Sequence, residues 1–447
     1  MPARPARSPR ARARARGLAL AAPLALAGLA LSACGSSSSS GSSGGSTPAA
    51  TGGSTSSAAA DSSSAAGGAS AATTSAAASA TGAPTAATAA CKLTSPPKSA
   101  ASQPPAAAST EKATGKVGVI LPDTTSSTRY TLYDKPLLQS ALTAAGLTAD
   151  IQNAGGSTSR FQQIAQSMIG EGVKVLIIDS IDATSGATVE KQATQAGIKV
   201  IDYDRVNLGG TAQYYVSFDN EDVGKLQGQT LVDCLTASGV TDPQIIALDG
   251  GTDVDNNAVL FAKGAKSVFD PLQSQGKLKV VSESVVKGWD VNLAAPTFTQ
   301  ALTAAGGKVD GVLAANDDLA NASIGVLKGS GLAGRVSVTG QDSGVVGLQN
   351  VITGQQSMTI FKNVKNEATA AAQLAIALIG GKDPASAGLP LSKFDDPKSP
   401  SHNIQALLLP AEVITQANVN DVVTAGALKA ADICKGIESD CAKLGVK

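Results

Sequence analysis

Short apolar segments alternate with helical patterns from Lys116 onward, and this alternation limits the possible folds more than any other property of the sequence. Two of the helical patterns are at residues 133–145 and 160–171, and the second carries apolar side chains along one side. Short apolar strands joined by crossover helices form parallel sheets that are covered on both faces. We therefore predict strands at residues 117–121, 148–152, 173–178, 199–203, 244–248, 279–282, 311–314 and 336–339.

The predicted strands are too many for a single sheet of this period, and the pattern restarts after Ser217-Phe218-Asp219-Asn220. We therefore predict an α/β fold with two doubly wound parallel-sheet lobes. The segment 218–220 is predicted to belong to the hinge between them.

Polar residues directly follow most of the predicted strands. Ligands of open α/β sheets lie at the carboxyl ends of the strands. Two such rims that face each other would form a deep cleft rich in Asp, Asn and Arg, which suits a neutral polyhydroxylated ligand. The rim residues are Asp123 to Arg129, Asp179-Ser180, Asp204-Arg205, Asp249 to Asn257, Trp289-Asp290, Asn316-Asp317 and Gln341-Asp342.

The first 33 residues have the pattern of an export signal. Six arginines precede residue 17, and the apolar stretch 18–31 is short and interrupted by Pro23, which favours a signal peptide over a membrane span. Ser32-Ala33-Cys34 resembles the lipobox of bacterial lipoproteins. This resemblance implies cleavage before Cys34 and a diacylglycerol on its sulfur. Ordinary secretion with a chance cysteine is the alternative.

Residues 34–115 are predicted to form a disordered tether. Ser, Gly, Ala and Thr dominate as far as about residue 90, and a Pro-richer linker follows over 95–114. Its first 55 residues or so would reach on the order of 40 Å. Without the signal peptide, 29 basic residues face 35 acidic ones, a net charge of −6, and no basic patch suggests nucleic acid.

Four cysteines remain once Cys34 is set aside, and an even number outside the cytoplasm suggests two disulfides with three possible pairings. Cys434 and Cys441 are seven residues apart around Gly436, so this pair is favoured. Cys91 with Cys234 then follows only by elimination, and free buried thiols stay open.

The sequence offers little for catalysis. His402, the only histidine, lies in a Pro/Ser-rich loop, so no Ser-His-Asp arrangement can be proposed. No phosphate loop and no metal-spaced His/Cys cluster occur, and we expect no cofactor. An enzyme remains an alternative only through paired carboxylates such as Asp317 and Asp342, because glycoside hydrolysis uses two carboxylates.

At the rims the sequence resembles the periplasmic xylose-binding proteins and their Gram-positive lipoprotein relatives. The resemblance runs from about Val117 to the C-terminus, and the cysteine-bearing tail from Asp432 is similar to that of the Gram-positive branch. The segments that carry it are Tyr203-Asp204-Arg205, Tyr215 to Glu221, Asp255 to Ala258, Ala315-Asn316-Asp317, Thr339 to Asp342 and Met358 to Lys362.

The resemblance implies a type I binding-protein fold whose chain crosses between the lobes three times. It places residues 116–219 and about 354–382 in the N-terminal lobe, and residues 220–353 and about 403–447 in the C-terminal lobe. It implies a monomeric receptor that binds xylose or a related aldose, catalyses nothing, and delivers the sugar to an ABC permease and its ATPase. The receptor would be lipid-anchored outside the cytoplasm, or periplasmic. A sugar sensor that presents its ligand to a membrane kinase or chemoreceptor is the alternative.

The resemblance also assigns the sugar site. Arginine and lysine would donate to ring and hydroxyl oxygens, Asp342 would accept from hydroxyls, and Trp289 would stack on the sugar ring. The residues implied are Arg129, Tyr130, Asp204, Arg205, Asn256, Asn257, Trp289, Asn316, Asp317, Asp342 and Lys362. Tyr130 and Phe361 stand where relatives commonly have tryptophan and tyrosine, so the identity of the sugar stays open.

Several of these residues have structural alternatives. Asp342 could cap the helix that begins near Val345, and Asp204 could form an ion pair with Arg205 that supports the cleft. Trp289 could belong to the core, although its neighbours have the pattern of an exposed loop. Asn256-Asn257 could simply shape a turn.

Overall fold

The computed structural model describes residues 89–100, 111–399 and 402–447. The predicted signal peptide, Cys34 and most of the predicted tether lie outside these ranges, so the lipid anchor stays a prediction. None of the helices in the described ranges is long and apolar enough to cross a membrane.

The first lobe is built on a seven-stranded sheet with the strand order β11-β12-β5-β4-β3-β1-β2. All neighbouring strands are parallel except the edge pair β11–β12. The strands are β1 (Lys116–Leu121), β2 (Thr148–Asn153), β3 (Val175–Ile178), β4 (Lys199–Tyr203), β5 (Tyr214–Phe218), β11 (Ser392–Asp395) and β12 (Asn403–Leu409). The central strands are buried on both faces, which explains their continuous apolar runs.

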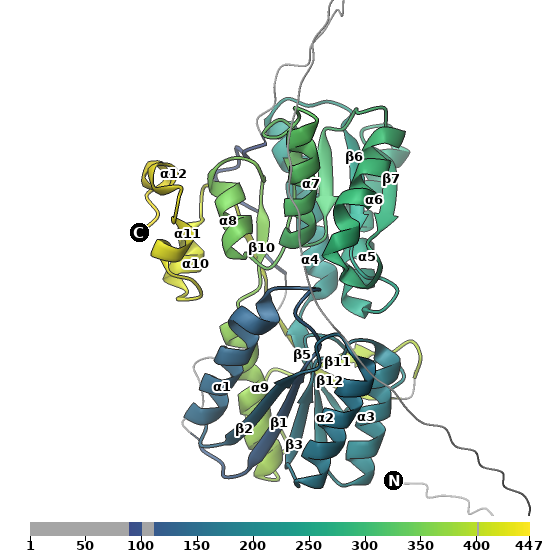
Figure 1. The fold of residues 1–447 in the computed structure, drawn as a ribbon, viewed down its shortest axis with the longest axis vertical. Coiled ribbons are helices and arrows are strands. Elements are labelled where there is room, and N and C mark those ends of the chain that lie inside the picture. The colour runs from purple at the N-terminus through teal and green to yellow at the C-terminus, as the bar shows by residue number, and fades with distance from the viewer. Residues whose placement is uncertain (1–88, 101–110, 400–401) are drawn as a thin grey trace, which may run out of the picture. The chain divides into compact units, whose positions relative to one another are not determined.

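Helices cover both faces of this sheet (Figure 1). Alternate strand side chains pack against α1 (Lys135–Ala144) and α9 (Val364–Ile379) on one face. The opposite face packs against α2 (Thr158–Gly170) and α3 (Ala183–Gln195). A π-helical turn, Tyr130–Asp134, leads into α1 and begins at the carboxyl end of the sheet.

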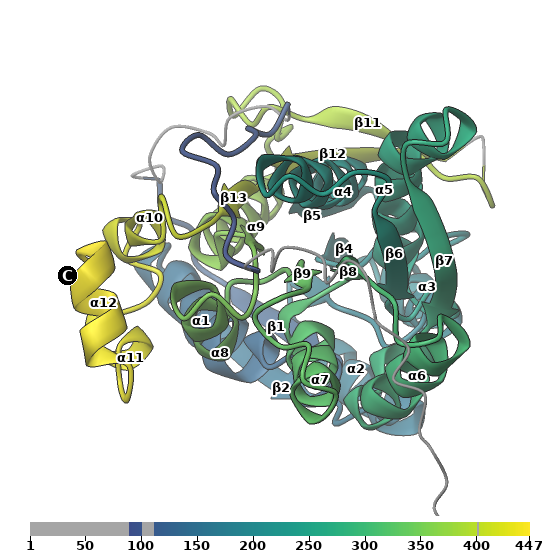
Figure 2. The same cartoon turned by 90° about the horizontal axis from the view of Figure 1, so that it is seen from above.

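The second lobe has a four-stranded parallel sheet with the order β7-β6-β8-β9. Its strands are β6 (Gln244–Asp249), β7 (Lys279–Val285), β8 (Gly311–Ala314) and β9 (Ser337–Val338). One face is covered by α4 (Asn220–Ala237) and α5 (Asn256–Ser274), the other by α6 (Val291–Ala304) and α7 (Asp317–Gly329). Figure 2 shows these two helical layers on either side of the sheet.

A small sheet and the C-terminal tail complete the second lobe. β10 (Thr359–Phe361) pairs with β13 (Glu412–Ile414), next to α8 (Val345–Ile352). The tail contains α10 (Asn420–Thr424), α11 (Ala430–Ile433) and α12 (Glu438–Leu444), and it packs on α8. Cys434 is joined to Cys441 within this tail.

The predicted architecture of two α/β lobes linked by three crossings is confirmed, but two lobe boundaries were wrong. The chain crosses after β5, after β10 and after β12. Residues 403–409 belong to the first lobe because β12 pairs with β5. Residues 354–361 belong to the second lobe, because β10 pairs with β13 and its Ile360 lies in that lobe's core.

The predicted tether was also extended too far. Residues 89–100 pack on the second lobe: Cys91 is joined to Cys234 of α4, and Lys98 bridges Glu412 of β13. Ser99 donates a hydrogen bond to Asp222 at the start of α4. A disulfide together with backbone pairing orders this segment, although its composition is that of a linker.

Candidate ligand-binding cleft

A polar cavity lies where the two lobes meet, with about 290 Å³ of space that is partly open to solvent. Nine of the eleven predicted site residues line it. The lining residues are Ser126, Ser127, Arg129, Tyr130, Asp204, Arg205, Asp255, Asn257, Phe261, Trp289, Asn316, Gln341, Asp342 and Lys362.

Arg129 is the most heavily bonded cation of the cleft. Its Nε donates a hydrogen bond to Asp134 at 2.8 Å. Its Nη2 donates to Asp134 at 2.7 Å and to Glu367 at 2.6 Å. Nη1 donates to Asp204 at 3.1 Å. Four of the five N–H groups of the guanidinium therefore point to carboxylates, which leaves one Nη1 hydrogen for a ligand. Arg129 mainly holds the other groups in place.

Asp204 lies at the centre of the polar network. Its carboxylate accepts hydrogen bonds from Arg129 and from the Tyr130 hydroxyl, and Lys362 Nζ is 3.9 Å away. Burial raises the pKa of Asp204, but Arg129, Lys362 and Arg205 outweigh burial and lower the pKa to about 2. Asp204 is therefore a permanent negative charge that contacts two cations of the ligand space, Arg129 and Lys362.

Arg205 lies near acids of both lobes but donates no hydrogen bond to either. Its Nε lies 3.5 Å from Asp255 and 3.9 Å from Asp179, and its Nη2 donates to Ser126 Oγ at 3.0 Å. No direct ion pair joins Arg205 to Asp204 among the described residues, so the predicted alternative of such a supporting pair is wrong.

Trp289 is both a core residue and a lining residue of the cleft, two roles that were predicted as alternatives. It is only 4% exposed and belongs to the core of the second lobe, where it packs edge-to-face on Phe261 at a centroid distance of 6.5 Å. Its Nε1–H donates to Asp255 at 3.0 Å, and its ring also lines the cleft. The indole is therefore fixed in orientation before any ligand arrives.

Asp342 and Asn316 connect the second lobe to the first. Asp342 accepts from Ser127 Oγ at 3.1 Å and pairs with Lys362 at 3.1 Å. The Asn316 amide donates to the Ser126 carbonyl at 3.4 Å. The capping residue of α8 is Gly344 without a side-chain bond, so Asp342 does not cap that helix.

Asn257 ties the cleft to the hinge. Its amide donates to the Asp204 carbonyl at 2.8 Å, and its Oδ1 accepts from Tyr215 and Asn220. Asn257 is 2% exposed and its oxygen is fully engaged, so it does more than shape a turn. These hydrogen bonds therefore connect the ligand space to the first crossing of the chain between the lobes.

Backbone strain is concentrated at the same place. Five non-glycine residues of the described ranges have a positive φ, and three of them line the cleft: Asp204 (57°), Trp289 (59°) and Asp342 (90°). Left-handed backbone is unfavourable for side chains other than glycine and tends to occur at functional sites. The fold therefore places these three side chains in the cavity against local conformational preference.

The three cations of the cleft are all paired with carboxylates: Arg129 with Asp134, Lys362 with Asp342, and Arg205 with Asp255. A charged ligand would need a side chain of opposite charge, and that side chain would first have to leave one of these ion pairs. A neutral polyhydroxylated ligand needs only charge-assisted hydrogen bonds, which these groups can both donate and accept.

The sequence shows which family carries this geometry. Residues 117–383 match the periplasmic binding protein domain. The chain belongs to the periplasmic binding protein family. The D-xylose-binding periplasmic protein of Escherichia coli (strain K12) is 36% identical over 251 residues, which are 56% of this chain and 74% of that protein. The multiple sugar-binding periplasmic receptor ChvE of Rhizobium radiobacter is 34% identical over 340 residues, which are 72% of this chain and 92% of that receptor.

A solved structure supports the same fold. The carbohydrate transporter solute-binding protein from Chloroflexus aurantiacus, in complex with D-glucose, is 28% identical with a TM-score of 0.64. The similarity covers 72% of this chain and 98% of that one. The predicted type I fold and the predicted family are thus both confirmed.

Two predicted site residues of this periplasmic binding protein do not line the cleft. Asn256 begins α5 and lies outside the cavity wall. Asp317 instead accepts hydrogen bonds from Gln356 and from the Gly344 amide, and so braces the loop that carries Asp342. Burial raises the pKa of Asp317 to about 8. Asp317 follows a rim strand, but its side chain points beneath the rim.

Five lining residues were not among the predicted site residues: Ser126, Ser127, Asp255, Phe261 and Gln341. Four of them lie within the rim segments identified above. Their position after a predicted strand therefore placed them at the cleft, although no role was assigned to them. Phe261 gave no signal, because it reaches the cavity one helical turn into α5.

Asp249 is the last residue of β6, and it lines a second-lobe cavity beside Glu283 and Lys266 instead of the cleft. Burial and then Glu283 raise its pKa to about 7. A raised carboxyl pKa means that stability is fully present below about pH 4 and is lost as the pH rises through about 7. The loss approaches about 1.4 kcal/mol per pH unit for a group that titrates alone. We expect Asp249→Asn to flatten this decline in urea unfolding at pH 5, 6, 7 and 8. An unchanged pH slope in the variant would contradict the assignment.

Proposed function

We propose that this periplasmic binding protein is the extracytoplasmic solute-binding component of an ABC-type sugar importer. It binds one monosaccharide, xylose or a related aldose, in the cleft between the lobes. The observation that carries this proposal is the chemistry of the cleft between the lobes: paired charges, amides and one fixed indole face line the same space. The relatives named for D-xylose and for multiple sugars support the choice of ligand.

The roles of the residues follow from their free hydrogen-bonding groups. Asp342 and Asp204 accept from sugar hydroxyls, while Arg205, Lys362 and the remaining Nη1 hydrogen of Arg129 donate. Asn316 both donates and accepts. Trp289 presents an apolar face to the C–H face of the ring.

Binding is coupled to closure of the lobes. Ser127, Arg129 and Arg205 come from the first lobe, whereas Trp289 and Asp342 come from the second. A sugar that touches both sets binds the closed form better than the open form, and its differential affinity shifts the population toward closure. The closed form would dock on a permease, whose ATPase drives import. A Cys34 lipid and the tether would keep the receptor beside its partner, anchored on the outer face of the cell membrane.

No catalytic step is proposed. The one carboxylate pair suggested by the sequence, Asp317 with Asp342, is not assembled for glycoside hydrolysis, because Asp317 does not line the cleft. The family is one of binding proteins.

Calorimetry on the secreted chain without its signal peptide tests the proposal. We expect D-xylose or a related aldose to bind with a micromolar dissociation constant, about −8 kcal/mol. Asp342→Ala and Trp289→Ala should abolish measurable binding, because each removes a group that touches the sugar. Small-angle scattering should show compaction with the bound sugar. Binding of an amino acid in place of every aldose tested would refute the proposal.

A further inference from the structure

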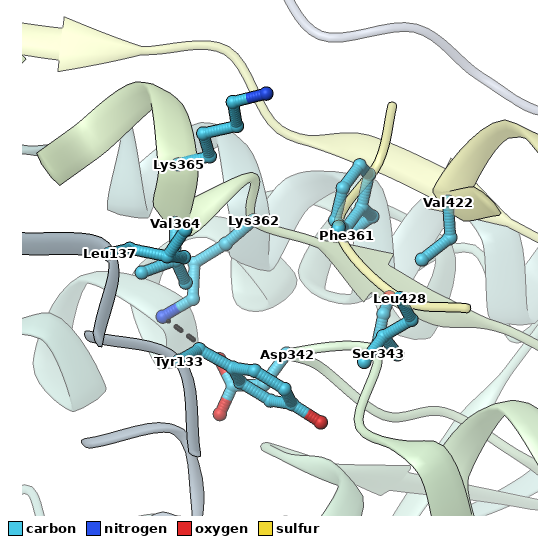
Figure 3. A pocket seen from close by; sticks show the side chains of 11 residues that line it. Tyr133, Leu137, Asp342, Ser343, Phe361, Lys362, Val364, Lys365, Val422 and Leu428 are labelled. Carbon is cyan, nitrogen blue, oxygen red and sulfur yellow. Dashed lines mark ion pairs between the residues drawn. The ribbon is translucent and has the colours of Figure 1, made fainter. Parts of the chain in front are cut away.

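The turn that carries Asp342 is strained at two adjacent residues. Asp342 has a φ of 90° and Ser343 a φ of 52°, so two successive residues other than glycine have a left-handed backbone. Figure 3 shows both side chains, with Asp342 paired to Lys362, which also lines the sugar cleft. Backbone strain of this kind persists only where surrounding contacts hold the chain in place.

The backbone amides of the turn, at Asp342, Ser343 and Gly344, each donate a hydrogen bond to a different group. The acceptors, in the same order, are the Ile360 carbonyl at 2.8 Å, the Thr359 hydroxyl at 3.2 Å and Asp317 Oδ2 at 3.0 Å. The first two acceptors belong to β10, which follows the turn in the chain. Asp317 is the first residue of α7, so its carboxyl ties the turn to a different element of the second lobe.

The carboxyl of Asp317 is buried against two glycines. Its Oδ1 accepts a second hydrogen bond from Gln356 at 2.9 Å, and the Asp317 amide donates to the Gln341 carbonyl at 3.0 Å. A Cβ atom at Gly340 would lie 2.1 Å from Oδ1, and a Cβ atom at Gly347 would lie 2.1 Å from Oδ2. Only glycine at these two positions therefore leaves room for the carboxyl. Its hydrogen bonds need lone pairs, which a carboxyl offers in either protonation state.

We propose that Asp317 is a positioning residue for sugar binding, whose carboxyl holds the strained turn 342–344 so that Asp342 stays in the cleft wall. Asp317 does not line the cleft, so its effect on the sugar passes through Asp342, which accepts from sugar hydroxyls. The effect on sugar affinity rests on the proposed function, whereas the hold on the turn does not.

The hold on the turn is tested without sugar, by urea unfolding of the chain without its signal peptide, followed by circular dichroism. Alanine normally stabilises a helix interior relative to glycine. Gly347→Ala in α8 should nevertheless lower the urea midpoint, because its methyl group displaces the Asp317 carboxyl. Gly325→Ala in α7 is the matched control: this glycine is exposed and a Cβ atom there would meet open space, so the midpoint should rise.

Asp317→Ala removes the carboxyl itself and so shows whether the carboxyl is what Gly347 accommodates. In the Asp317→Ala background, Gly347→Ala should no longer lower the urea midpoint. An equal loss in both backgrounds, or a gain in the wild type, would overturn the proposal.

Calorimetry with D-xylose tests the positioning role. We expect Asp317→Ala to weaken binding roughly 2- to 30-fold, as for other residues that act on a ligand without touching it. Gly347→Ala should also weaken binding, and the double variant should bind no more weakly than Asp317→Ala. Asp317→Asn keeps one oxygen for the Gly344 amide and should recover most of the affinity. Gly325→Ala should leave the affinity unchanged.

An unchanged xylose affinity in a folded Asp317→Ala variant would show that Asp317 serves stability alone, and it would overturn the proposal. If the wild type binds no sugar at all, the proposed function fails and the positioning role fails with it. The urea experiment then still decides whether the Asp317 carboxyl holds the turn.

Discussion

Replacing Arg129 with methionine should lower the free energy of unfolding by about 3–5 kcal/mol. Arg129 is 2% exposed, and its guanidinium is bonded to Asp134, Asp204 and Glu367. Removing the cation leaves Asp134 and Asp204 without their common partner, and a buried charge without a partner is strongly destabilising. Urea unfolding followed by circular dichroism at pH 7 measures the loss.

Glu367→Gln is the matched control for this network. Burial, with a smaller contribution from neighbouring acids, raises the pKa of Glu367 to about 8, so its carboxyl is mostly protonated at pH 7. A glutamine has the same shape and the same neutral charge, so we expect a change below about 1 kcal/mol. A loss as large as that of Arg129→Met would show that Glu367 is ionised in the folded protein and would contradict this account. Arg129→Lys should be intermediate, because an ammonium cannot form the forked contact with Asp134.

The parts of the fold that follow from local pattern could be predicted from the sequence. The strands at 199–203 and 311–314 were predicted with their observed bounds, because continuous apolar runs between helices identify buried parallel strands. β5 and β10 to β13 were missed as strands. β12 becomes a strand of the first lobe by pairing with β5, nearly 200 residues earlier in the chain, and no local period reveals such a partner.

The candidate site shows the same division. Position after a strand identified Asp204, Arg205 and Asp342 as rim residues, and all three line the cleft. The same rule failed for Asp317, because the direction of a side chain at a strand end depends on its partners, here Gln356 and the Gly344 amide.

The partners that fix Arg129 were also invisible in the sequence. Asp134 lies in the turn before α1, and Glu367 lies in α9, more than 230 residues further along the chain. Only the packing of these helices on one face of the first sheet brings them to the same guanidinium. The position of Arg129 in a rim segment therefore predicted a ligand contact, whereas in the structure its guanidinium chiefly bonds to buried acids of the first lobe.

Changing Asp204 to asparagine should weaken D-xylose binding by roughly 30- to 5,000-fold, because breaking a buried, hydrogen-bonded charge pair costs about 2–5 kcal/mol. The carboxylate orients Arg129 and Lys362 toward the ligand space and accepts from Tyr130. An amide keeps the shape and tolerates the positive φ of residue 204, so the loss reports the charge. Calorimetry measures the affinity, and circular dichroism checks that the variant is folded.

Asp242→Asn provides the control, since Asp242 also has a positive φ, of 50°, but is exposed before β6 and outside the cleft. Its effect on xylose affinity should be negligible. The pH dependence separates charge from shape. With a pKa of about 2, Asp204 is ionised at both pH 5 and pH 7, and its contribution is lost only as the pH falls from about 4 through 2. The ratio of wild-type to Asp204→Asn affinity should therefore be the same at pH 5 and pH 7. A ratio that falls toward one at pH 5 would mean that Asp204 is protonated there, and that Arg129 and Lys362 do not hold its charge.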